Sequence, residues 1–256
     1  MADAGSAQTA RIDVLWPAPQ DDVSDDELLT RYGREDRGIP WLRVNFISSV
    51  DGAASANGLS AGLGVPADRR VFDLLRRLTD VVIVGAGTVR AEGYGPMRLD
   101  PPQVKWRVDA GLSEHPVFAI VSGRLDLDPA SPIFTDAPVR PIVITSNASP
   151  VDKREALAAV ADVLVCGEDS LDLVAVRRQL AERGLTQQHC EGGPSLFASF
   201  IAADVVDELC LTVSPVLEAG DSGRISSGTE STPRGLALGH VLRSEAALLL
   251  RYVRAE

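Results

Sequence analysis

Three short segments carry the residues that could do chemistry, and each directly follows a segment that reads as a strand. They are Asn45–Gly52, Val84–Glu92 and Cys190–Leu196. Short apolar runs bounded by glycine and polar residues are typical of strands. In an open α/β sheet, ligands gather at the carboxyl ends of the strands. These three segments are therefore the candidate binding loops.

The segment Cys190–Leu196 is the most informative, because two glycines precede a proline that suits the first position of a helix. The free N–H groups and the dipole of a helix start attract an anion, and Gly192 and Gly193 allow a diphosphate to come near. Ser195 adds a hydroxyl in the first turn. Glu191 suits a neutral ring, such as a pyrimidine or a pterin, better than a phosphate. The alternative is a helix start at which the glycines only provide flexibility.

The other two segments carry weaker signals. Gly85 and Gly87 leave backbone N–H groups open to a phosphate or a flat ring. Arg90 stands where a Rossmann fingerprint needs its third glycine, so a tight strand-to-helix turn is the alternative. In the first segment, Asp51 can accept a proton or a hydrogen bond from a ligand. It is also a typical turn residue ahead of Gly52.

A metal site is not indicated. His189-Cys190-Glu191 spells the H-x-E of zinc deaminases, but the P-C-x-x-C that completes that site is missing downstream. The three cysteines, Cys166, Cys190 and Cys210, are spread singly. This spacing gives no disulfide framework and is consistent with a reducing cytosol.

Composition excludes several classes of protein. The 256 residues carry a formal charge of −11, which argues against a nucleic-acid partner. No stretch approaches the ~18 consecutive apolar residues of a membrane helix. Met1–Ala10 lacks the basic and apolar parts of a secretory signal, so we expect a cytoplasmic protein. We expect a lead-in of residues 1–35, with a loose start and a short helix, and one domain over residues 36–256.

The elements between the loops predict an α/β fold with a mostly parallel central sheet and an antiparallel C-terminal edge. A capping box at Ser24–Glu27 opens the first helix, and Pro66 opens the clearest one. Asp169 or Ser170 is the expected N-cap of a later helix. Strands are predicted at 41–48, 81–84, 117–121, 141–145, 162–166, 206–213 and 246–253, and helices also at 152–160, around 173–180 and from 194.

The ordered set of motifs resembles the pyrimidine reductases of riboflavin biosynthesis. Each piece alone is common, but the order is specific and extends from about Leu42 to the C-terminus. The pieces are Ser49–Gly52, Ser60, Arg69-Arg70, Leu74–Arg76, Val84–Val89, Glu191–Leu196, Val206–Leu209 and Pro215.

The resemblance implies a dihydrofolate-reductase-like fold, a homodimer, and NADPH as the reductant of a pyrimidine ribosylamine phosphate. The ribosyl group becomes a ribityl chain. Carried over by position, the NADPH contacts are Ile47, Gly87, Thr88, Glu92, Ser122, Gly192, Gly193, Pro194, Ser195 and Leu196. The substrate contacts are Asn45, Ser60, Arg76, Arg98 and Glu191. Glu92 or Asp51 is the candidate acid–base group.

The departures from the family pattern concern the domain content and the substrate side. The deaminase domain of many bacterial members is absent, so we expect reductase activity alone. Ala61–Val65 replaces a segment that often carries a polar residue, and Asn45 stands where bacterial members often have lysine. Glu92-Gly93-Tyr94 replaces an acidic residue followed by proline.

Two other functions remain open. One is an NADPH-dependent reductase of a pterin such as dihydrofolate, and the other is a cofactor-binding protein without turnover. The choice of NADPH over NADH also stays open, since Arg124, Ser146 and Asn147 are only candidates for the 2′-phosphate.

Overall fold

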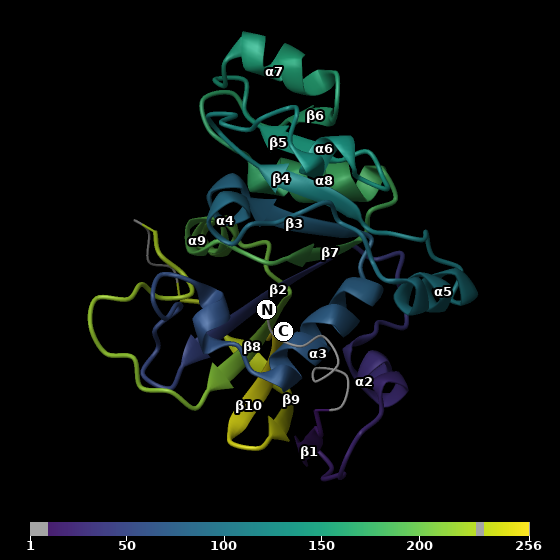
Figure 1. Cartoon of the computed structure of the whole chain (residues 1–256), viewed down its shortest axis with the longest axis vertical. Coiled ribbons are helices and arrows are strands. Elements are labelled where there is room, and N and C mark those ends of the chain that lie inside the picture. The colour runs from purple at the N-terminus through teal and green to yellow at the C-terminus, as the bar shows by residue number, and fades with distance from the viewer. Residues whose placement is uncertain (1–9, 229–232, 256) are drawn as a thin grey trace.

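The computed structural model describes residues 10–228 and 233–255, which build one ten-stranded sheet (Figure 1). Its strands are β1 (Asp13–Trp16), β2 (Trp41–Ser49), β3 (Val81–Gly85), β4 (Val117–Val121), β5 (Ile142–Thr145), β6 (Asp162–Val165), β7 (Gln187–Cys190), β8 (Glu208–Ser214), β9 (Leu236–Ser244) and β10 (Ala247–Arg254). Their order across the sheet is β1-β9-β10-β8-β2-β7-β3-β4-β5-β6. From β8 to β6 all neighbours are parallel, and β10, β9 and β1 form the antiparallel edge.

Helices cover both faces of β3, β4 and β5, which is why these strands are apolar without alternation. The longer elements are α2 (Asp25–Tyr32), α3 (Pro66–Arg77), α5 (Pro101–Asp109), α7 (Val151–Ala158), α8 (Leu173–Glu182) and α9 (Pro194–Ala202). The shorter ones are η1 (Ser60–Leu63), α4 (Ala86–Ala91) and α6 (Pro132–Thr135). None of the helices described is long and apolar enough to cross a membrane.

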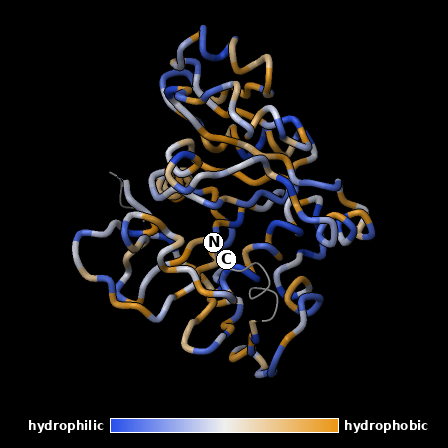
Figure 2. The backbone as a smooth tube through the Cα atoms, viewed as in Figure 1, coloured by the Kyte–Doolittle hydropathy of each residue, from blue (hydrophilic) through white to orange (hydrophobic). Residues whose placement is uncertain are grey.

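The core follows the alternation of the strands. On one face, Ile83 and Ala119 pack against α8 and α9. On the other, Val82 and Phe118 pack with residues of α4, α6 and α7, and α3 and α2 cover the strands nearer the antiparallel edge. Figure 2 shows this arrangement as apolar strand segments in the middle of the molecule.

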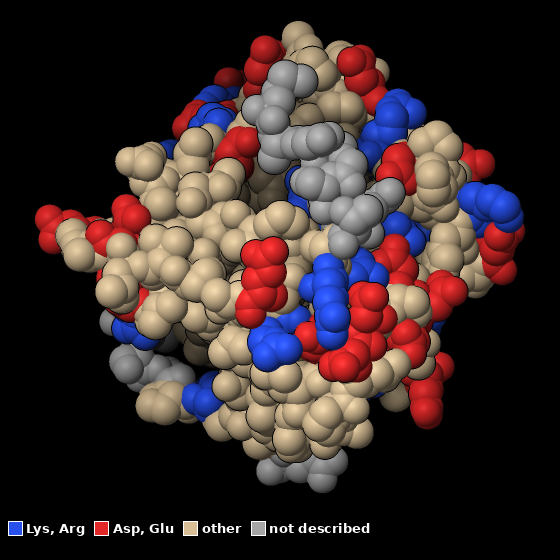
Figure 3. Space-filling view, turned by 60° about the horizontal axis from the view of Figure 1, so that its bottom comes forward, with Lys and Arg blue, Asp and Glu red and all other residues tan. Residues whose placement is uncertain are grey.

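Residues of the expected lead-in pack against the same sheet. β1 pairs with β9, and Leu28 and Tyr32 of α2 are buried with α3 residues. The capping box at Ser24 is confirmed, because Ser24 and Glu27 bond to each other's backbone N–H. Residues 1–9 lie outside the described part of the chain. On the face shown in Figure 3, acidic and basic side chains intermingle. Asp13 of β1 pairs with both Arg11 and Arg243.

The structure differs from the sequence predictions at three places. β9 is not among the predicted strands, and it forms because its backbone pairs with β10. Asp172, and neither Asp169 nor Ser170, caps α8 by accepting the Ala175 N–H at 2.9 Å. β1 and α5 were not predicted at all.

Candidate active site

Two of the three candidate loops meet at the carboxyl edge of the sheet. β3 and β7 are neighbours, and the Glu191 N–H donates to the Ile83 carbonyl at 3.1 Å. Beyond the strands, the Gly85 N–H donates to the Gly192 carbonyl at 2.9 Å. The two glycine loops are therefore joined backbone to backbone.

The close approach of these loops explains why glycine stands at both positions before α9. A Cβ added to Gly193 would lie 2.3 Å from Thr88 Oγ1, which is far inside van der Waals contact. Gly192 has a φ of +108°, a region that other residues rarely adopt. A Cβ added to Gly192 would lie 3.6 Å from the Phe46 ring. Phe46 in turn stacks on Phe197 of α9.

The first turn of α9 offers backbone donors at this edge. Gly193 is the N-cap and supplies no side chain, and Pro194 occupies the first turn, as predicted. Ser195 is exposed, while Leu196 is buried. A helix start of this kind suits an anion such as a diphosphate. The glycine cradle therefore fits the dinucleotide that the sequence predicted.

Glu191 is the most buried acid of the site, with only 1% of its side chain exposed. Arg76 of α3 binds it with two hydrogen bonds, Nε to Oε1 at 2.6 Å and Nη2 to Oε2 at 2.7 Å. Burial opposes the charge of Glu191, yet the charge and hydrogen bonds of Arg76 lower its pKa below the ordinary value. Sequence reasoning placed both residues against the substrate; in the structure they bind each other.

Two further residues complete this cluster and were not predicted. The Tyr94 hydroxyl donates to Glu191 Oε2 at 3.0 Å, and burial raises the pKa of Tyr94. His189 is fully buried, with Nε2 3.6 Å from Glu191 Oε1, and burial lowers its pKa to about 4. The alternation of β7 could have revealed His189, since it faces the same side as Glu191. Tyr94 lies in a loop with no such signal.

The two candidate acid–base residues have different surroundings. Glu92 lies at the end of α4 and accepts the Ser60 backbone N–H on Oε1 at 2.9 Å. Asp51 is exposed and accepts the N–H groups of Glu218 and Ala219 on its two carboxylate oxygens. It also accepts the Ser49 hydroxyl, and these hydrogen bonds lower the pKa of Asp51 to about 2.

The remaining predicted residues divide between the two edges of the sheet. Asn45 and Ile47 lie on β2, where they pair with Cys210 and Thr212 of β8, and Ser122 follows β4, where its hydroxyl accepts the Leu125 N–H at 3.0 Å. Arg98 lies apart from them. It donates to the Asp136 carbonyl at 2.9 Å and lines a depression of about 480 Å³ along α5.

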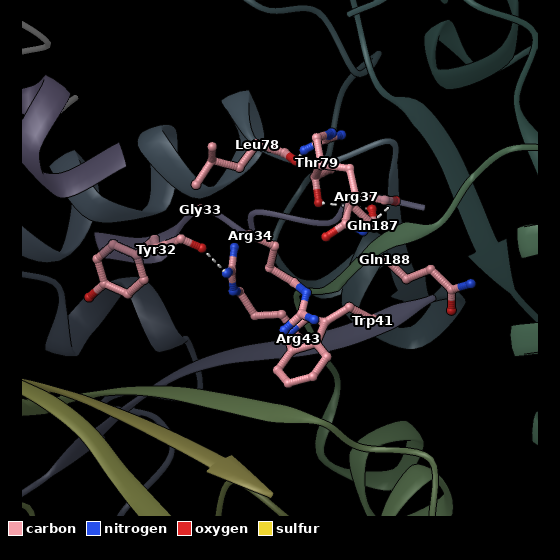
Figure 4. A pocket seen from close by; sticks show the side chains of 10 residues that line it. All are labelled: Tyr32, Gly33, Arg34, Arg37, Trp41, Arg43, Leu78, Thr79, Gln187 and Gln188. Atoms are coloured by element: carbon pink, nitrogen blue, oxygen red, sulfur yellow. Dashed lines mark hydrogen bonds between the residues drawn. The ribbon is translucent and has the colours of Figure 1, made fainter. Parts of the chain in front are cut away.

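That depression belongs to the opposite, amino edge of the sheet, because the Leu99 N–H donates to His115 just before β4. A second cavity at this edge lies between the starts of β2 and β7. Figure 4 shows Arg34 stacked on Trp41 there, with Arg43 and Gln187 nearby. Its volume of about 10 Å³ holds no more than one water. The carboxyl edge therefore remains the candidate site.

Comparison with known proteins agrees with this fold. The chain is 29% identical over 191 residues to the 2,5-diamino-6-ribosylamino-4(3H)-pyrimidinone 5′-phosphate reductase of Archaeoglobus fulgidus, covering 74% of this chain and 87% of that one. The protein of the same name from Methanothermobacter thermautotrophicus is 30% identical over 187 residues, covering 72% and 82%. A solved pyrimidine reductase-like protein from Corynebacterium diphtheriae superposes with a TM-score of 0.82 at 26% identity, over 91% of this chain and 100% of that one.

The riboflavin biosynthesis reductase Rib7 of Saccharomyces cerevisiae shares the fold, with a TM-score of 0.64 at 17% identity over 90% of this chain and 98% of that one. The α/β, dihydrofolate-reductase-like architecture with an antiparallel C-terminal edge is thus confirmed. The family described as the RibD C-terminal domain matches residues 40–248. The chain belongs to the RibD C-terminal domain family.

Proposed function

We propose that this chain is an NADPH-dependent reductase of a pyrimidine ribosylamine phosphate, which converts the ribosyl group to a ribityl chain. The observation that carries the proposal is the junction of the Gly85–Thr88 loop with Gly192 and Gly193 at the start of α9. Two of the archaeal relatives are named as reductases of such a pyrimidinone. NADPH, when bound, supplies the hydride.

The residues of the chain would then bind and orient the two ligands. Backbone N–H groups of Ser195 and Leu196 would hold the diphosphate, and Thr88, packed against Gly193, would border the cofactor. The ion pair of Arg76 with Glu191 presents a fixed charge distribution beside the proposed cofactor site. Preorganised charges of this kind need no rearrangement during the reaction.

We propose Glu92, ahead of Asp51, as the group that holds or moves a proton at the sugar oxygen. Glu92 uses Oε1 for a backbone N–H of η1, whereas Asp51 uses both oxygens to hold the loop at residues 218–219. Ser60, through that same backbone contact, and Asn45 are the proposed neighbours of the sugar.

NADPH oxidation in the presence of 2,5-diamino-6-ribosylamino-4(3H)-pyrimidinone 5′-phosphate, with dihydrofolate in a parallel assay, tests the proposal. We expect turnover of the pyrimidinone only. Turnover of dihydrofolate would favour the pterin alternative, and NADPH binding without turnover of either would favour a binding protein.

Gly193→Ala tests the cofactor site separately. The added Cβ collides with Thr88 Oγ1, so we expect NADPH affinity to fall by at least tenfold. Gly235→Ala is the matched control, because Gly235 lies just before β9, outside the predicted NADPH contacts, and its Cβ would meet only Ala255 at an ordinary contact distance of 3.8 Å. Equal NADPH affinity in the two variants would remove the cofactor from this helix start.

We further propose a cytoplasmic homodimer. The free, buried thiols of Cys166, Cys190 and Cys210 suit a reducing compartment. One face of β8 and β10 supports the dimer: Leu211 pairs with Leu250 and Val213 with Leu248, and all four side chains remain partly exposed. Their neighbours Cys210, Thr212 and Leu249 are buried on the opposite face.

A further inference from the structure

His189 is a buried polar side chain whose hydrogen-bonding groups are unused. It lies on β7 between Arg43 of β2 and Val82 of β3, which pair with it in register, and its side chain is fully buried. Within the described part of the chain, neither Nδ1 nor Nε2 has a hydrogen-bond partner. Almost all buried polar atoms in native proteins are hydrogen-bonded, because an unsatisfied one costs free energy. An apolar side chain would avoid this cost, so the imidazole calls for a functional explanation.

The Glu191 carboxylate has one acceptor position left, on the oxygen nearest to His189. A carboxylate accepts roughly four hydrogen bonds, shared between its two oxygens. Oε2 accepts Arg76 Nη2 at 2.7 Å and the Tyr94 hydroxyl at 3.0 Å. From the described residues, Oε1 accepts only Arg76 Nε, at 2.6 Å. His189 Nε2 lies 3.6 Å from Oε1. This separation is roughly 0.7 Å longer than a usual N–H···O hydrogen bond, so a small movement of the carboxylate would close it.

The proton of the neutral imidazole belongs on Nε2. Burial lowers the pKa of His189 to about 4, so the ring is uncharged at neutral pH. Besides Glu191, the charges that act on the ring come from Arg76 of α3, Arg43 of β2 and Glu208 of β8. A proton on Nε2 points at the Glu191 carboxylate, whereas a proton on Nδ1 would leave a lone pair facing that carboxylate. His189 is therefore an unused N–H donor beside Glu191.

Arg76 is the partner of Glu191 that a ligand can reach. Its side chain is 17% exposed, whereas that of Glu191 is 1% exposed. Among the described residues, Arg76 Nη1 has no hydrogen-bond partner, since Nε and Nη2 make both bonds to Glu191. A guanidinium binds phosphate as well as carboxylate. A phosphate at Nη1 would therefore compete with Glu191 for the charge of Arg76 and weaken that ion pair.

We propose that His189 is a positioning residue, which donates from Nε2 to Glu191 Oε1 when a phosphate of the substrate binds Arg76. The inference rests on the proposed function and assigns a role to a residue that touches neither ligand. The new hydrogen bond offsets the weakened ion pair and keeps the carboxylate in place for the rest of the substrate. A hydrogen bond to a charged group of this kind corresponds to roughly a 10-fold difference in affinity.

His189→Leu and His189→Gln test the inference by calorimetric titration with ribose 5-phosphate in the absence of NADPH. This probe is the sugar phosphate of the pyrimidinone and needs no turnover. We expect His189→Leu to bind it roughly 10-fold more weakly than wild type, because the donor to Glu191 is lost. His189→Gln should restore most of the affinity, because its amide is also a neutral N–H donor.

His240→Leu is the matched control. His240 is also buried, and its Nε2 also lacks a hydrogen-bond partner in the described ranges. It lies on β9, four strands away from β7, with its ring against Tyr32. We expect this variant to keep the wild-type affinity for ribose 5-phosphate, and thermal unfolding shows whether each variant is folded.

Proton NMR of wild type gives a signature that packing alone would not produce. The chain has three histidines, so their imidazole N–H resonances can be assigned by substitution. A hydrogen-bonded N–H of a buried imidazole resonates downfield and exchanges slowly with water. We expect such a resonance to appear, or to move downfield, when ribose 5-phosphate is added, and to be missing from His189→Gln.

Four results overturn the inference: no binding of ribose 5-phosphate to wild type, equal binding to His189→Leu, no recovery in His189→Gln, or no change in the imidazole resonances. NADPH oxidation with the phosphorylated pyrimidinone separates the inference from the proposed function. If the affinity follows His189 but the pyrimidinone is not reduced, the positioning role stands and the reductase activity fails. If the pyrimidinone is reduced but all variants bind ribose 5-phosphate equally, the reductase activity stands and the positioning role fails.

Discussion

Arg76 binds both carboxylate oxygens of Glu191 through Nε and Nη2. Removing the Arg76 side chain therefore first affects the buried charge of Glu191. Arg76→Ala would leave Glu191 desolvated and unpaired except for Tyr94 and His189. Breaking a buried ion pair costs about 3–5 kcal/mol, and the 17% exposure of the Arg76 side chain reduces this to roughly 2–4. Urea unfolding measures the loss.

Arg69→Ala is the matched control for that experiment, since Arg69 lies on the same helix and its side chain is 63% exposed. We expect this variant to stay within about 0.5 kcal/mol of wild type. Equal stability of the two variants would contradict a structural role for the Arg76–Glu191 pair. It would leave direct substrate binding as the role of Arg76.

His189 makes the stability of the protein depend on pH. Its pKa falls from the ordinary 6.5 to about 4 in the folded state, because burial disfavours the imidazolium. Between these values the unfolded chain binds more protons, so stability is complete above about pH 6.5 and falls as pH drops toward 4. For this group alone, the loss between pH 7 and pH 5 is roughly 2 kcal/mol.

We therefore expect His189→Leu to lose less stability than wild type as pH falls, measured as the difference in unfolding free energy between pH 7 and pH 5. His240, whose pKa burial also lowers to about 4, keeps its own contribution, so part of the slope remains. A slope identical to that of wild type would show that His189 is protonated equally in both states.

At the scale of elements, the loop between β8 and β9 is fastened to the site from two sides. Asp51 holds its start, and the Ser227 N–H donates to the Pro194 carbonyl at the start of α9 at 3.2 Å. The Ala54 N–H donates to the Gly223 carbonyl between these points. The loop therefore connects the turn after β2 with the proposed cofactor helix.

Asp51→Ala removes the first of these attachments. We expect faster proteolysis within residues 215–228 and weaker NADPH binding, with kcat reduced no more than twofold at saturating NADPH. Asp51→Asn keeps an acceptor for one backbone N–H and should fall between wild type and Asp51→Ala. A large loss of kcat in both variants, with proteolysis unchanged, would instead make Asp51 the acid–base group.

Elements with a local signal were predictable, and those that depend on distant partners were not. Pro66 and the periodic leucines were enough to predict α3, and Gly192-Gly193-Pro194 were enough to predict α9. β9 becomes a strand only through its pairing with β10 and β1, and its first residues look like loop in isolation. A short edge strand such as β1 has the same difficulty.

The site shows the same limit. Its three loops could be found in the sequence because glycines and polar residues follow segments that read as strands. The pairing of Arg76 with Glu191 could not, because it depends on how α3 lies across β7. Arg98 was expected to contact the same substrate as Arg76, but it lies at the depression along α5, on the opposite edge of the sheet.

At the scale of the whole molecule, one apolar surface lacks an explanation within a single chain. The pairs Leu211–Leu250 and Val213–Leu248 point away from the face that α3 covers, and Leu248 is 36% exposed. Contiguous exposed apolar surface of this kind usually marks an interaction site. In a closed two-fold dimer the same patch meets itself, which makes a second copy of the chain a fitting partner.

Leu250→Lys places a charge at the centre of this surface, so we expect wild type to sediment as a dimer and this variant as a monomer, measured by sedimentation velocity at micromolar concentration. Leu217→Lys is the control, because Leu217 is 78% exposed in the loop after β8 and should leave the dimer intact. Burying an unpaired ammonium costs several kcal/mol in each of the two symmetric halves, so the shift in dissociation constant should exceed 100-fold. A wild-type chain that sediments as a monomer, or a Leu250→Lys variant that remains dimeric, would contradict assembly through this face. In the second case Leu15 and Trp16 of the edge strand β1 would be the next residues to substitute, since both are exposed apolar side chains.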